Sequence, residues 1–138
     1  MNAEAYKKPL PIPNDDTQVL FDGLREGRLM IQRCKNCGEY RFVARQRCDL
    51  CGSAESEWKA AAGRGKVISY AYVHQKYHPG FADELPYNIA TVELEEGPRL
   101  TTNLVQLGDR KPYGGMPVEV VFEKLTDEIS LHKFKPVG

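Results

Sequence analysis

Hydrophobic and polar residues alternate along much of the C-terminal half of the chain, a pattern typical of half-buried β-strands. Val118, Val120 and Phe122 alternate with Glu119 and Glu123, although a valine at position 121 interrupts the alternation. Other stretches rich in β-branched and aromatic residues are separated by turn sequences such as EEGP and GDRKPYGG. The pattern predicts five strands, over residues 66–74, 87–96, 99–107, 117–125 and 129–136.

The N-terminal part has a different pattern. Leu20, Phe21 and Leu24 form an apolar stripe at helical spacing, which predicts a short helix within residues 14–27. Residues 28–34 then read as a strand that leads to the first cysteine.

Five short strands after a small cysteine-rich module favour a closed or nearly closed barrel, because closure hides sheet edges. Residues 60–67 are small and glycine-rich and are interpreted as a connector between the two parts. The segment 75–86 is long for a hairpin loop, and loops of that length usually have a function.

Composition narrows the function classes. The 138 residues contain 19 Lys and Arg and 19 Asp and Glu, so the net charge is zero. A balanced charge disfavours a protein that coats DNA or an anionic membrane. The chain also has no apolar run of signal-peptide or membrane-spanning length, so we expect a cytoplasmic protein with no membrane partner.

All four cysteines lie in two CxxCG motifs, Cys34 with Cys37 and Cys48 with Cys51. Two such turns facing each other supply four thiolates, the ligand set of a closed structural zinc site. We therefore predict one structural Zn²⁺ per chain, favoured over iron. A filled coordination shell leaves no thiol as a nucleophile, and no other catalytic motif is present, so no catalytic residue is assigned.

Basic residues surround the cysteines. They either balance the negative charge of a tetrathiolate site or form an anion-binding face for phosphates, and both interpretations stay open. These residues are Arg28, Arg33, Lys35, Arg41, Arg45 and Arg47.

The order of these motifs resembles the DUF35 family. The CxxCG pairs are followed by GRGKVISY at 63–70, IATVELEEGPRL at 89–100 and GMPVEVVFEKL at 115–125. The resemblance covers about residues 15–135 and implies a rubredoxin-like zinc ribbon followed by a five-stranded OB-fold. The chain departs from the family at Val43-Ala44, where prolines are common, and at Asp49.

With the predicted elements, this resemblance gives a mainly β fold in three parts. These are an extended arm at 1–14, a helix plus zinc ribbon at 15–59, and an OB-fold at 60–138.

The resemblance also implies a function: an accessory subunit of a thiolase-fold enzyme acting on acyl-CoA thioesters, of thiolase, synthase or aldolase type. The predicted assembly is a heterotetramer built on the partner's dimer, with the chain not catalytic by itself. In this interpretation Arg45 and Arg47 contact the phosphates of CoA. An aromatic loop with Tyr77, His78 and Phe81 docks the partner, or alternatively packs over the barrel mouth.

The alternative function is a single-stranded nucleic-acid-binding OB-fold, which would stack bases on aromatic side chains. Tyr70 and Tyr72 offer such rings, but the acidic cluster at 93–96 disfavours a phosphate backbone. Nucleic acid is therefore the less favoured partner, and electron transfer would require iron in place of zinc.

Overall fold

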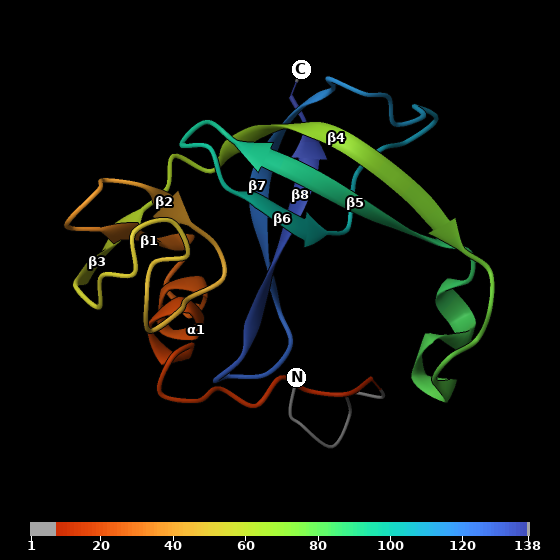
Figure 1. Ribbon diagram of the computed structural model, residues 1–138. Coiled ribbons are helices and arrows are strands. Elements are labelled where there is room, and N and C mark those ends of the chain that lie inside the picture. The colour runs from red at the N-terminus through yellow and green to blue at the C-terminus, as the bar shows by residue number, and fades with distance from the viewer. Residues whose placement is uncertain (1–7, 138) are drawn as a thin grey trace.

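The computed structural model describes residues 8–137 and contains two antiparallel sheets and one α-helix (Figure 1). A three-stranded sheet has the order β2-β1-β3, and a five-stranded sheet has the order β6-β5-β4-β7-β8. The elements are α1 (Gln18–Arg25), β1 (Met30–Cys34), β2 (Tyr40–Arg41), β3 (Ser56–Ala60), β4 (Arg64–Val73), the 3-10 helix η2 (Pro79–Glu84), β5 (Tyr87–Leu94), β6 (Arg99–Thr102), β7 (Pro117–Lys124) and β8 (Ser130–Pro136).

The predicted fold class is confirmed. The chain is mainly β, with an N-terminal helix, a cysteine cluster and a curled five-stranded sheet consistent with an OB-fold. We call residues 29–60 the cysteine ribbon and residues 64–136 the barrel. Within residues 8–137 no helix is both long and apolar enough to cross a bilayer.

Helix α1 lies within the predicted segment 14–27, and the residues directly before it form a hydrogen-bonded turn. Asn14 Oδ1 accepts hydrogen bonds from the main-chain N–H of Asp16 at 2.9 Å and of Thr17 at 3.1 Å. The side chains of Leu20 and Leu24 are buried, as the apolar stripe predicts.

Each strand of the barrel lies within its predicted segment except β4, which starts two residues early, and β6 is much shorter than predicted. After Thr102 the chain leaves β6 and pairs with β8 instead. Phe134 N donates to Asn103 O at 3.1 Å, and Val105 N donates to Phe134 O at 2.8 Å. These bonds bring the two edges of the curled sheet together, so the barrel is nearly closed.

The cysteine ribbon and the barrel share one continuous hydrophobic core. Val67, Val92 and Phe134 are completely buried in the barrel, and Leu29 and Ile31 of the ribbon belong to the same cluster. The proposed division of the chain at residues 59 and 60 therefore stays a prediction.

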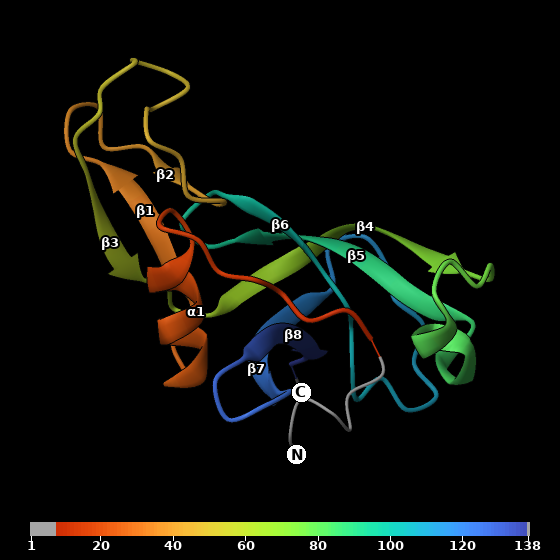
Figure 2. The ribbon, with the colours of Figure 1, turned by 90° about the horizontal axis from the view of Figure 1, so that it is seen from below.

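Strand β3 was not predicted, although it completes the ribbon sheet by pairing with the whole of β1. The long 75–86 loop contains η2, and the first described residue of the arm lies close to it. Residues 8–17 cross the molecule from α1 towards η2 (Figure 2), and Lys8 Nζ lies 2.9 Å from a carboxylate oxygen of Glu84. Residues 1–7 of the predicted arm lie outside the described residues.

Candidate metal centre and its surroundings

The two CxxCG turns have the same hydrogen-bond geometry. In the first, Gly38 N donates to Cys34 O, and Cys34 N donates to Glu39 O, both at 2.9 Å. In the second, Gly52 N donates to Cys48 O, and Cys48 N donates to Ser53 O, both at 2.9 Å. Gly38 and Gly52 have φ angles of 79° and 78°, in the left-handed region that glycine tolerates best.

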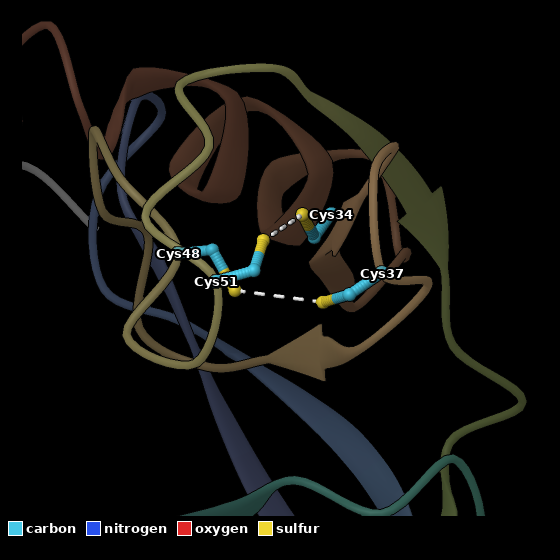
Figure 3. A group of neighbouring side chains, drawn as sticks. All are labelled: Cys34, Cys37, Cys48 and Cys51. Atoms are coloured by element: carbon cyan, nitrogen blue, oxygen red, sulfur yellow. Dashed lines mark hydrogen bonds between the residues drawn. The ribbon is translucent and has the colours of Figure 1, made fainter.

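These turns bring all four predicted cysteines together (Figure 3). Their sulfur atoms all lie within 4.8 Å of one another, with Cys34 and Cys51 3.6 Å apart and Cys37 and Cys48 3.7 Å apart. A tetrahedral ion with bonds of about 2.3 Å to sulfur would space its ligands about 3.8 Å apart. The cysteines are therefore positioned to bind a metal ion.

The pKa values of the four thiols also favour a bound metal ion. The N–H of Cys37 lowers the pKa of the Cys34 thiol, and the N–H of Cys51 lowers the pKa of the Cys48 thiol. For Cys37 the Glu39 N–H acts in the same direction, but burial and the neighbouring sulfurs raise its pKa to about 12. The fourth thiol thus resists ionisation beside the other three, a penalty that a divalent cation removes.

Arg47 and Arg33 occupy equivalent positions, each directly before the first cysteine of a turn. Arg47 Nη1 donates to Gly52 O at 3.0 Å, and Arg33 Nε donates to Gly38 O at 3.3 Å. Each arginine therefore braces its own turn. The signal for this role is the repeated hexapeptide RCxxCG at 33–38 and 47–52, which the sequence analysis missed.

Arg45 is the more available of the two predicted CoA contacts. Its side chain is more than half exposed, and Nη1 lies 3.6 Å from a carboxylate oxygen of Asp49. The structure brings Arg45 and Arg47 into the same exposed segment beside the metal centre.

Arg41 is not part of a basic surface, which corrects its place in the predicted anion-binding face. Arg41 is only 7% exposed, and its Nε donates to Gln32 Oε1 at 2.8 Å. The same Gln32 oxygen accepts from Arg45 N at 2.9 Å, while Arg41 Nη2 donates to Arg45 O at 3.0 Å. Gln32 and Arg41 therefore position the segment that carries Arg45.

His132 lies where the cysteine ribbon meets the barrel. Its ring is 5.8 Å from that of Phe42, edge to face, and Nδ1 is 3.1 Å from Thr102 Oγ1. Burial, helped by the nearby charge of Lys133, lowers the pKa of His132 to about 4. The imidazole is consequently neutral near pH 7 and packs as part of this joint.

The aromatic loop is only partly exposed. Tyr77 is 75% exposed, whereas His78 and Phe81 are half-buried. His78 Nδ1 accepts from Gly80 N at 3.0 Å at the start of η2, and the Phe81 ring lies 5.3 Å from that of Tyr87. His78 and Phe81 thus contact neighbouring residues of the loop and β5, and docking of a partner by this loop stays a prediction.

Beside this loop is a cavity of about 770 Å³ between the arm, η2 and the barrel. Its polar side chains bond to one another: Lys133 Nζ donates to Asn103 Oδ1 at 2.5 Å and lies 3.6 Å from a carboxylate oxygen of Glu123. Burial lowers the pKa of Lys133, with Glu123 opposing the shift. The lining includes Lys8, Phe81, Tyr87, Leu104 and Lys133.

Comparison with known proteins agrees with this architecture. Residues 21–57 match the family profile described as "ChsH2, rubredoxin-like zinc ribbon domain", and residues 58–123 match "ChsH2, C-terminal OB-fold domain". The fold and the four-cysteine site thus define a protein that joins a zinc ribbon to an OB-fold. The chain belongs to the DUF35 family, as the resemblance in its sequence indicated.

Three relatives illustrate the family. A DUF35 domain-containing scaffold protein of Methanocaldococcus jannaschii is 39% identical over 112 residues, covering 76% of this chain and 79% of the relative. A probable enoyl-CoA hydratase alpha subunit of Thermomonospora curvata is 40% identical over 129 residues, covering 94% of this chain. The chain spans only 40% of the length of that hydratase subunit. The solved Ltp2-ChsH2(DUF35) aldolase superposes with a TM-score of 0.80 at 40% identity, covering 91% of this chain and 98% of that chain.

Proposed function

We propose that this chain is a non-catalytic accessory subunit of an enzyme that acts on acyl-CoA thioesters, with a thiolase-fold partner. The observation that carries the proposal is the match to the Ltp2-ChsH2(DUF35) aldolase, at 40% identity over 98% of that chain. The similarity to a probable enoyl-CoA hydratase alpha subunit supports a CoA thioester as substrate and a second subunit as partner.

The metal in this proposal is one Zn²⁺ per chain with a structural role. Cys34, Cys37, Cys48 and Cys51 would hold it, and when bound it would fix the two turns against each other. Four thiolates complete a tetrahedral shell, so the centre offers no position for water or substrate.

Arg45 and Arg47 are the proposed contacts for the phosphates of CoA. A guanidinium offers two parallel hydrogen bonds to a phosphate, and both side chains are at the surface beside the metal centre. Arg47 already uses Nη1 for Gly52 O, so Arg45 has more donors to spare.

The test is the rise in melting temperature that CoA causes, because a ligand bound only by the native state stabilises it. We expect Arg45→Ala to abolish most of that rise in the purified complex. Arg33→Ala is the matched control for Arg47→Ala, since it removes an equivalent brace and leaves both proposed contacts in place. Equal CoA responses in all variants would remove Arg45 and Arg47 from the site.

The partner is tested by purifying the tagged chain from its native host and measuring the mass of the intact complex. We expect an acyl-CoA enzyme of thiolase fold in a heterotetramer built on that enzyme's dimer. The chain by itself is expected to show no thiolase, synthase or aldolase turnover.

The second candidate function is single-strand nucleic-acid binding, favoured by the Tyr70 and Tyr72 rings, each 44% exposed. Against it, basic side chains of β4 and β6 are already paired with a carboxylate of β5. Glu93 lies 3.0 Å from Arg99 and 3.8 Å from Lys66. Salt-sensitive, submicromolar oligonucleotide binding together with no enzyme partner would favour this function over the accessory subunit.

A further inference from the structure

Half of strand β4 has a free edge. β4 pairs with β7 only through Arg64–Lys66, and the main chain of Val67 then bonds to Gly115 and Met116. Beyond that point residues 68–73 continue along β5 as the outermost strand (Figure 1). In residues 8–137, no main-chain hydrogen bond joins 68–73 to any strand other than β5. Alternate N–H and C=O groups of this segment therefore face outward without a strand partner.

Charged residues and proline, which normally protect an exposed strand, are absent from this edge, although the register shifts at its start, between Val67 and Ser69. Residues 67–73, VISYAYV, contain no charged residue and no proline. The outer strand of the ribbon sheet, β3, instead carries Glu57 and Lys59, which lie 3.7 Å apart at their charged ends. Proteins usually place charges or proline on strand edges to prevent pairing with another chain. An edge of six residues that carries neither charge nor proline is consequently suited to pair with another chain.

Aromatic side chains flank the same edge. Tyr70 lies opposite Ala90 and Tyr72 opposite Asn88 on β5, and Ala90 is completely buried. Since residues directly opposite share a face, Tyr70 and Tyr72 extend the inner face of the sheet beyond the part that β7 covers. Both rings are 44% exposed, and Tyr77, in the loop after β4, is 75% exposed. Aromatic rings of this kind bury a large area when a partner covers them.

We propose that an extended segment of the partner subunit pairs with residues 68–73 of β4 as an added strand, with Tyr70 and Tyr72 packed against it. This inference rests on the proposed function, because it names how the enzyme subunit docks. Main-chain hydrogen bonds would hold the segment, and the tyrosines would select its side chains.

A second copy of this chain is a less favourable partner for the β4 edge than a segment of the enzyme subunit. Six residues of strand are about 20 Å long, and pairing two such edges buries far less than the roughly 1,200 Å² of a stable specific interface. A segment that belongs to a larger subunit brings the rest of that subunit's surface with it. The exposed Tyr77 next to the edge provides an area over which such a surface could continue.

Hydrogen–deuterium exchange tests the pairing directly, with the complex purified from the native host compared with the free chain. We expect about three alternate amides within 68–73 to slow at least tenfold in the complex, since alternate N–H groups would gain partners. The amides of β3 at 56–60 serve as the internal reference and should change little.

A side-chain variant adds a second measurement. Ala71→Lys places a charge on the exposed edge and should weaken the complex by tenfold or more, as protective lysines do on natural edges. Ala62→Lys is the matched control, because Ala62 is also exposed and lies outside the edge; it should change affinity by less than about twofold.

The outcomes separate the two proposals. A complex with the enzyme subunit in which 68–73 exchanges as in the free chain would overturn the docking mode and leave the proposed function standing. Recovery of no enzyme subunit would overturn both. Protection of 68–73 in the isolated chain, with the mass of a dimer, would assign the edge to a second copy and overturn the inference.

Discussion

The cysteine ribbon buries few side chains of its own, whereas the barrel buries apolar side chains from every strand. In the ribbon, the buried apolar side chains and thiols are those of Leu29, Ile31 and two of the cysteines, and its strands are five residues long or shorter. In the barrel, Val67, Val92, Val118 and Phe134 are all completely buried. A ribbon with so small a core would depend on a metal ion held by its four cysteines, whereas the barrel depends on burial of apolar surface.

Loss of the metal should have the largest effect, and that effect should be concentrated in the ribbon. We expect Cys48→Ser to abolish binding of about one zinc per chain and to unfold residues 29–60, since zinc affinity in such sites is folding free energy. Amide exchange should rise across the ribbon and stay slow in β5, β7 and β8. Ala54→Ser, a similar change at an exposed ribbon position, is the control. Retention of both metal and ribbon protection in Cys48→Ser would contradict a structural role.

Phe134→Ala should destabilise the barrel and leave the metal site intact. Its side chain is completely buried in the shared core, so truncation should cost about 3–5 kcal/mol of unfolding free energy in urea titration. Phe134→Leu, which keeps most of the volume, should cost less than half as much. The folded fraction of either variant should hold its zinc, because the sulfur ligands are untouched. Zinc loss in parallel with unfolding would show that ribbon and barrel fold as one unit.

The joint between the two regions should respond to acid through His132. Its pKa is about 4 in the folded chain, below the ordinary value of 6.5, so the unfolded state binds the proton more readily. The neutral ring therefore contributes its full share of the unfolding free energy above pH 6.5. This contribution, roughly 3 kcal/mol, is lost as the pH falls towards 4. Acid also protonates the thiolates, so the measurement is the difference between the wild type and His132→Gln. Identical pH profiles would show that His132 titrates normally.

The smallest effect is expected from the arginines that brace the two turns. Arg33→Ala and Arg47→Ala each remove one hydrogen bond to a glycine carbonyl, worth about 1 kcal/mol. Both variants should therefore release zinc to a chelator several times faster than the wild type, and by similar factors. Lys35→Ala, an exposed cation in the first turn, is the control. A much larger effect at Arg47 than at Arg33 would show that the two turns are not equivalent.

The local sequence was sufficient to predict the metal ligands and most of the strands. The bonds of each CxxCG turn span six residues or fewer, so spacing and glycine alone specify the turn. Strand periodicity likewise located β5, β7 and β8, because alternation of burial is imposed residue by residue. The repeat RCxxCG was also present in the sequence and would have revealed the bracing role of Arg47.

What the sequence left open depends on contacts between distant residues. Arg41 is buried only because Gln32, nine positions earlier, faces it across the ribbon sheet, and composition alone had grouped it with surface cations. The barrel closes where Asn103 and Val105 meet Phe134, about thirty residues away, which is why β6 ends early. Exposure of the β4 edge is likewise fixed by where β7 stops pairing with β4. Spacing along the chain determines local turns and strand periodicity, whereas burial of a side chain depends on which distant residues the fold places next to it.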